Sequence, residues 1–278
     1  MKIYRTKEVI IIEHEGNYYP SPQSDWDACV NRANLFTTLL NEIKNSKSDA
    51  SLKQTIETEL RAPIGNQEVW ASGVTYLRSR EARMEESKDA GGGDFYARVY
   101  EADRPELFFK APAYRVVGSG DKVRIRKDSK WNVPEPELTL FICSTGTIEG
   151  YTVGNDMSSR DIEGENPLYL PQAKSYNGST AVGPCLFVTE QPIASNTIIS
   201  ISIQRSGIAV FENQISIDRM KRKHIELVEY LFREVTFPYG TYLMTGTGIV
   251  PPDSFTLQSG DVIKISIENI GTLINTVA

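Results

Sequence analysis

The chain has 278 residues, of which 40% are hydrophobic and 24% are charged, and its formal net charge is −6. It contains no apolar run near the ~20 residues that a membrane-spanning helix needs, and its acidic balance predicts no basic surface for nucleic acid. We therefore expect a globular protein that binds a small molecule, with no nucleic acid and no membrane as partner. The first residues show no export-signal pattern, which favours the cytoplasm.

Cysteines and histidines narrow the choice of chemistry. Cys29, Cys143 and Cys185 stand at unrelated spacings, which argues against a disulfide framework or a zinc site and predicts buried thiols. The two histidines, His14 and His224, lack the neighbours of a Ser-His or Cys-His catalytic arrangement. Any metal is then expected to bind to oxygen, which suits Mg²⁺, Mn²⁺ or Ca²⁺.

The N-terminal part predicts a hairpin followed by a helix. Residues 1–20 alternate apolar and polar side chains around a turn at Glu15-Gly16-Asn17. Residues 25–46 carry apolar residues at helical spacing behind an aspartate cap. Pro63 and Gly65 then interrupt the pattern. We place a domain boundary there, with a small N-terminal domain at residues 1–64 and a larger domain at residues 65–278.

The larger domain begins with a strand, a charged helix and three glycines, Gly91 to Gly93. This composition is typical of a mobile loop or an active-site lid, and a surface excursion fits it equally well, so the role of the loop stays open. From Pro105 onward the chain is rich in predicted strands, with one helix expected at residues 217–234. The pattern indicates an α+β, β-rich fold.

Three acidic residues stand out in "WNVPEPELTLFICSTGTIEGYTVGND". Glu135 and Glu137 lie two positions apart, so a strand would present both carboxylates on one face. Pro134 and Pro136 favour an edge or irregular strand end. Like charges so close raise one pKa unless a cation lies between them. Asp156 ends the next strand and offers a third oxygen for a divalent ion; a solvated acidic edge is the alternative reading.

Several motifs together resemble the fumarylacetoacetate hydrolase superfamily. They are "PELFFKAP", "EPEL", "GNDMSSRD", "QAKSYNGSTAVGP", "MTGTG" and "LQSGDVIKISIENIGTLINTV", in that order over roughly residues 70–278. The resemblance implies a mixed β-sandwich roll with a small N-terminal α/β domain, and Mg²⁺ held by Glu135, Glu137 and Asp156. It also implies a 2-keto acid substrate contacted by Lys174 and Thr247. Assembly into a homodimer or homotetramer is expected on the same ground.

One stretch departs from the hydrolases of that family. Where they carry a His-Glu pair that activates water, "GVTYLRSREARMEE" has Ser79 and Ala82. This stretch is similar to the branch typified by 2-keto-3-deoxy-D-arabinonate dehydratase. The resemblance implies a hydro-lyase that dehydrates a 2-keto-3-deoxy sugar acid, with 2,5-dioxopentanoate as the product from the arabinonate. Hydrolysis or decarboxylation of an acylpyruvate-like substrate at the same metal is the alternative, and a keto-acid-binding protein without catalysis is a third reading.

The dehydratase reading needs a carboxylate as acid/base in place of histidine. Glu106, in "PELFFKAP", is the candidate, although a surface glutamate at a strand end fits the sequence too. Lys174 is the second catalytic candidate. Glu163 is expected to face the substrate, and Ser79 and Arg83 to bind its hydroxyls or carboxylate, while a charged helix face explains Arg83 almost as well.

Overall fold

The computed structural model of the chain describes residues 1–86 and 93–278, without the side chains of residues 83, 85, 86 and 93–96. The prediction for the three-glycine loop therefore falls largely outside the described residues, and so does the side chain of Arg83. No helix of the described part is long and apolar enough to cross a membrane.

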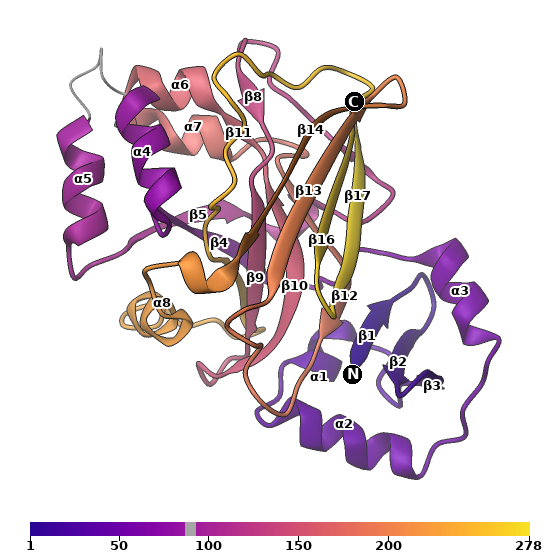
Figure 1. Cartoon of the computed structure of the whole chain (residues 1–278). Coiled ribbons are helices and arrows are strands. Elements are labelled where there is room, and N and C mark those ends of the chain that lie inside the picture. Colours follow the sequence, from indigo (N-terminus) through magenta and orange to yellow (C-terminus); the bar gives the residue numbers. More distant parts are fainter. Residues whose placement is uncertain (87–92) are drawn as a thin grey trace.

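Two β-sheets pack face to face and contain all but two of the strands in the described residues (Figure 1). The larger sheet has the strand order β3-β2-β1-β12-β10-β9-β15-β4-β5, with β6 beside β12, and the smaller one has the order β14-β13-β16-β17-β7. The strands of the larger sheet are β1 (Lys2–Arg5), β2 (Ile10–His14), β3 (Asn17–Pro20), β4 (Glu68–Gly73), β5 (Glu106–Ala111), β6 (Val116–Val117), β9 (Pro136–Ile142), β10 (Ile148–Asp156), β12 (Thr180–Phe187) and β15 (Thr241–Met244). Those of the smaller sheet are β7 (Lys122–Val123), β13 (Ile198–Arg205), β14 (Ile208–Ser216), β16 (Val262–Ile267) and β17 (Gly271–Val277), and β8 (Asn132–Val133) pairs with β11 (Ser158–Ser159).

The helices lie around the sheets. They are α1 (Trp26–Val30), α2 (Leu35–Lys44), α3 (Leu52–Glu59), α4 (Leu77–Glu86), α5 (Gly93–Glu101), α6 (Arg160–Glu165), α7 (Leu170–Lys174) and α8 (His224–Leu231). Short 3₁₀ turns occur at η1 (Ala113–Arg115), η2 (Pro167–Tyr169) and η3 (Ile217–Arg219). In Figure 1, α4 to α7 gather at one end of the larger sheet and α1 to α3 at the other. The predicted α+β, β-rich fold is confirmed.

Alternating burial explains the sheet packing. One face of β9 presents Leu138, Leu140 and Ile142 to the apolar core between the two sheets. The opposite face, with Phe141, packs against α1 and α2 in a second core. β9 is therefore buried on both faces, which is why its sequence runs apolar without a strict alternation. The three cysteines are buried free thiols, as expected.

The N-terminal hairpin is confirmed, and Glu15 (φ 51°) and Gly16 (φ 77°) supply the two left-handed positions of its turn. Strand β1 of the same segment pairs antiparallel with β12, so the N-terminal strands extend the large sheet. The division at residue 64 stays a prediction.

The expected helix at residues 25–46 is wrong as one element. Asp25 caps the chain as expected, because its Oδ1 accepts the Ala28 N–H at 2.8 Å. The chain then leaves the helix at Asn31 (ψ 62°) and restarts after Asn34, which is left-handed at φ 55°. Asparagine tolerates this conformation better than other residues with a Cβ, and helical periodicity carries no signal for such a break.

The expected helix at residues 217–234 is too long. It consists of the 3₁₀ turn η3 and the shorter α8, joined by an extended segment. Met220 (φ −75°, ψ 131°) in that segment forms an isolated bridge with Tyr76. A tertiary contact therefore overrides the local helical pattern.

Candidate active site

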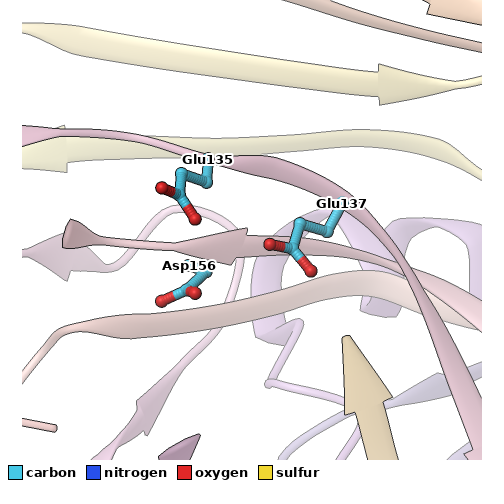
Figure 2. Close-up of side chains that lie close together, drawn as sticks. All are labelled: Glu135, Glu137 and Asp156. Carbon is cyan, nitrogen blue, oxygen red and sulfur yellow. The ribbon is translucent and has the colours of Figure 1, made fainter. Parts of the chain in front are cut away.

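Three buried carboxylates converge at the ends of two neighbouring strands. Glu137 is in β9, Glu135 immediately precedes that strand, and Asp156 ends β10. Their side chains turn toward a common space in Figure 2, and one oxygen from each lies within 4.8 Å of the others. The three residues are at most 4% exposed. The solvated acidic edge considered from the sequence is therefore excluded.

The prolines act as a strand start and not as an edge. β9 lies between β10 and β15, so the predicted edge position is wrong, whereas the irregular strand end is correct because Pro136 opens the strand. The carbonyl of Glu135 still accepts the Asp156 N–H at 3.0 Å. This bond keeps the two acidic segments in register beyond the regular ladder.

Lys174 is the central cation of the cluster; the sequence alone suggested it only as a weak candidate for binding a carboxylate, and the family resemblance strengthened that expectation. It ends α7, and its Nζ lies 2.7 Å from Glu135 Oε2, 2.9 Å from Asp156 Oδ2 and 2.6 Å from Ser158 Oγ. Glu163 Oε1 lies 4.0 Å away. Lys174 is 1% exposed, and burying a charged lysine is energetically costly unless anions and hydrogen-bond acceptors surround it, as they do here.

Two further cations were missed by sequence reasoning. Lys110 Nζ lies 2.6 Å from Asp156 Oδ1 and donates to Met157 O at 3.1 Å and to the Lys174 carbonyl. Arg160 Nη2 donates to Glu135 Oε1 at 2.6 Å. The signals were a lysine in the apolar stretch "ELFFKAP" and an arginine in "SSRD", where charged side chains interrupt buried segments.

The electrostatics follow from burial. Burial, followed by the neighbouring carboxylates of Asp156 and Glu135, raises the pKa of Glu137 well above its usual value. The Gly246 N–H opposes this shift because it donates to Glu137 Oε2 at 2.6 Å. Burial also lowers the pKa of Lys110, against the attraction of Asp156. An additional positive charge placed between the acids would stabilise the ionised form of Glu137 and lower its pKa again.

The donor set fits a hard divalent cation. The cluster offers only carboxylate oxygens, and Mg²⁺–oxygen distances of about 2.1 Å place ligand oxygens about 3 to 4 Å apart, close to the 4.8 Å span of these three. Each carboxylate oxygen has two lone pairs, so an oxygen that accepts an N–H can still coordinate an ion. These three residues could therefore hold Mg²⁺ or the larger Ca²⁺.

A pocket opens onto the cluster. It is lined by the three acids, Arg160, Lys174, Phe108, Ser79, residues 72–74 and residues 246–247. Ser79 is 8% exposed, and its Oγ donates to Tyr76 O at 2.7 Å at the start of α4. Thr247 Oγ1 bonds within its own turn, donating to Ile249 O at 3.2 Å. The predicted Ser79, Lys174 and Thr247 thus lie in one pocket with the acids.

Glu106 is not among the residues that line this pocket, but it lies against one of them. It starts β5 opposite Gly73 of β4, and strand alternation puts it on the same face as Phe108 and Lys110. A Cβ built on Gly73 would lie 2.0 Å from Glu106 Oε2, so the carboxylate rests directly on the glycine. Gly73 itself lines the pocket. The glycine was not predicted, and its signal was an isolated glycine at a strand end.

Histidine is absent from the described lining of the pocket. His14 lies in β2 and His224 in α8, and burial lowers the pKa of His224 to about 4. Ser79 and Ala82, which stand where the resemblance places the histidine and glutamate of the hydrolases, are both in α4. Ser79 lines the pocket and Ala82 is buried.

Comparisons with known proteins agree with this geometry. The family described as "Fumarylacetoacetate (FAA) hydrolase C-terminal" matches residues 69–278. A "Probable 2-keto-3-deoxyxylonate dehydratase" of Haloferax volcanii is 46% identical over 223 residues, covering 80% of this chain and 76% of that protein. A "2-dehydro-3-deoxy-D-arabinonate dehydratase" of Saccharolobus solfataricus is 43% identical over 226 residues, covering 81% and 76%.

A solved structure supports the same grouping. It is described as "2-keto-3-deoxy-D-arabinonate dehydratase complexed with magnesium and 2,5-dioxopentanoate", and it superposes with a TM-score of 0.84 at 34% identity, covering 100% of this chain and 98% of that one. With a family match over most of the chain, a shared fold and a buried acidic cluster, this protein belongs to the fumarylacetoacetate hydrolase family.

Proposed function

We propose that this protein is a Mg²⁺-dependent hydro-lyase that dehydrates 2-keto-3-deoxy-D-arabinonate to 2,5-dioxopentanoate. The observation that supports this most strongly is a pocket lined by three converging carboxylates and, among its described lining residues, no histidine, with the carboxylate of Glu106 against its lining residue Gly73. The names of the relatives at 46% and 43% identity support the same reaction class.

Glu135, Glu137 and Asp156 would hold the ion. When bound there, Mg²⁺ would neutralise part of their charge and draw electron density from the oxygens of a 2-keto acid. The oxygen-only donor set favours Mg²⁺, with Mn²⁺ or Ca²⁺ as substitutes. The three nearby cations keep the acids in place and prevent an excess of negative charge from repelling an anionic substrate.

Glu106 is the proposed acid/base. Its carboxylate takes a proton from C3 of the substrate and returns it to the C4 hydroxyl, so that the C4–O bond breaks and water leaves. A proton shift from C5 to C3, followed by tautomerisation, converts the terminal alcohol carbon to an aldehyde and balances the reaction as loss of one water. A carboxylate beside a largely buried pocket suits both transfers.

The other residues named from the family resemblance bind and orient the substrate in this proposal. Lys174 is the second catalytic group; its three donors bind Glu135, Asp156 and Ser158, so one of them would turn from its present partner to the keto-acid oxygens. Thr247 is assigned to the substrate carboxylate. Glu163, 1% exposed and near Lys174, orients that ammonium and faces a substrate hydroxyl. Ser79 and Arg83, on α4, are assigned to the hydroxyls or the carboxylate.

The test is turnover of 2-keto-3-deoxy-D-arabinonate by the purified protein with Mg²⁺. We expect 2,5-dioxopentanoate, loss of turnover after chelation, and a fall in kcat of about 10²- to 10⁴-fold in Glu106→Gln. Glu229→Gln, at an exposed position on α8, is the matched control and should behave as the wild type. No semialdehyde from any 2-keto-3-deoxy pentonate or hexonate would refute the proposal.

Acylpyruvates separate the alternative function from this one. Cleavage of an acylpyruvate into two acids, or its decarboxylation, would show that the same pocket serves a hydrolase or decarboxylase. We further propose a homodimer or homotetramer in the cytoplasm. Light scattering coupled to gel filtration measures the assembly, and a monomeric mass would contradict it.

A further inference from the structure

A short segment outside the pocket contacts both ends of the helix pair α4–α5. This segment, Met220 to Arg222, lies between η3 and α8. The helix pair is inserted between β4 and β5 and precedes the strand that starts with Glu106 (Figure 1). Its two ends are therefore the places where the chain leaves and re-enters the large sheet beside the pocket.

The entry to the pair is tied to the segment by backbone bonds. Met220 forms a bridge with Tyr76, and the Lys221 N–H donates to Thr75 O at 2.9 Å. The Tyr76 carbonyl in turn accepts the Ser79 hydroxyl at 2.7 Å. The segment thus lies one contact away from a side chain that lines the pocket.

The exit is held by Arg222, which is 8% exposed. Its Nη1 donates to Asp103 O at 3.0 Å, and its Nη2 donates to Val99 O at 3.2 Å and to Ala102 O. These are the carbonyls at the end of α5, which lack intrahelical donors. Glu226 Oε1, 2.6 Å from Nη1, fixes the guanidinium from α8. The planar fork of arginine suits these four acceptors at once.

Lys221 strengthens the same end. Its Nζ lies 2.8 Å from Glu101 Oε2 and donates to Tyr100 O at 2.5 Å, and it lies 4.3 Å from the centre of the Tyr100 ring. Within the pair, Arg80 of α4 lies over the same ring at 4.9 Å. Cation–π contacts and ion pairs therefore join α4, α5 and the 220–222 segment.

We propose that Arg222 is a positioning residue for the reaction, because it fixes the turn that ends three residues before Glu106. The segment holds the entry of the helix pair through Thr75 and the exit through Val99, Ala102 and Asp103. It thereby sets where Ser79 and Glu106 lie relative to the acids. The inference rests on the proposed role of Glu106 and adds a residue outside the pocket to it.

Arg222→Met keeps the length of the side chain and removes its donors. We expect kcat to fall about 10- to 100-fold, since a displacement of about 1 Å at the reacting groups has an effect of that size. The Kd for Mg²⁺, measured by calorimetry without substrate, should stay within about twofold, because the three acids lie on other elements. Arg222→Lys restores part of the donors and should recover part of kcat.

Two controls separate positioning from general stability. Arg219→Met, at an exposed position in η3, should leave kcat unchanged. In a Glu106→Gln background, Arg222→Met should cause no further loss if it acts through Glu106. A kcat for Arg222→Met within twofold of the wild type, or an equal additional loss in the Glu106→Gln background, would overturn the proposal.

Hydrogen exchange makes the result independent of turnover. The amides of residues 97–104 should exchange at least tenfold faster in Arg222→Met than in the wild type, while those of β9 and β10 keep their protection. Inactive wild-type protein would count against the proposed function alone. Unchanged exchange at residues 97–104 would count against the positioning role alone.

Discussion

Gly73 offers a test of where the Glu106 carboxylate must lie. In Gly73→Ala the new Cβ would lie 2.0 Å from Glu106 Oε2 and 2.6 Å from its Cδ, whereas ordinary contacts begin near 3.4 Å. The carboxylate must therefore retreat by roughly 1.4 Å. Gly73 does not adopt a positive φ, so alanine causes no backbone strain there. The crowded atoms belong to the end of a flexible side chain, and the fold can adapt.

The expected result is a catalytic defect in a folded protein. A shift of this size should lower kcat about 10²-fold, while the melting temperature stays within a few degrees and the Kd for Mg²⁺ within about twofold. The assay is the initial rate of semialdehyde formation at saturating substrate, accompanied by calorimetric titration of Mg²⁺. A matched control is Gly150→Ala in β10. Its new Cβ would lie 2.8 Å from Leu186 Cδ1, and neither residue lines the pocket. It should affect stability and leave kcat unchanged.

The outcome that refutes the reasoning is equally specific. If Gly73→Ala turns over at the wild-type rate, the observed position of the carboxylate is not the one that the reaction uses. If the alanine lowers kcat by the same factor in a Glu106→Gln background, its effect does not pass through Glu106.

Three further results are expected. Lys110→Met leaves Asp156 without its 2.6 Å partner and should cost about 3 to 5 kcal/mol of unfolding free energy in urea; a loss below about 1 kcal/mol would contradict the structural weight given to this pair. Mg²⁺ at about 100 times its Kd should stabilise the protein by about 2.7 kcal/mol, and Glu137→Gln should abolish most of this shift; an intact shift would remove Glu137 from the ligands. Burial lowers the pKa of His224 from the ordinary 6.5 to about 4 in the folded protein, so the unfolded chain binds a proton at a higher pH than the folded one. The free energy of unfolding should therefore fall by about 2 kcal/mol as the pH is lowered from about 7.5 to about 5. His224→Gln should remove that part of the pH dependence, and an unchanged slope would argue against it.

The sequence predicts the acids well, because their signal is local. Glu135 and Glu137 share a face through strand alternation alone, and Asp156 follows from the end of the next strand. The roles of Lys110 and Arg160 were not predicted because a lysine or arginine is usually exposed. Only the three-dimensional packing shows that these two side chains are buried against the acids. Local patterns also cannot show which partner a residue meets far along the chain.

The wrong prediction of one helix at residues 217–234 has the same cause. The pattern at residues 217–234 is helical in composition, yet Met220 and Lys221 form backbone contacts with Thr75 and Tyr76 instead. Pro134 and Pro136 were read correctly as a strand start but wrongly as an edge, because nothing in "PEPEL" reports that β15 arrives from more than 100 residues later. Long-range pairing decided each of these cases.

That pairing also orders the events of folding. β15 lies parallel to β4, and Thr241 Oγ1 donates to Glu68 O across a separation of 173 residues. Parallel contacts over such a distance close large loops and form slowly. The turn that brings Gly246 to Glu137 directly follows β15, so the proposed ion site is complete only after β15 has paired. We therefore expect Mg²⁺ to slow unfolding while leaving the refolding rate almost unchanged.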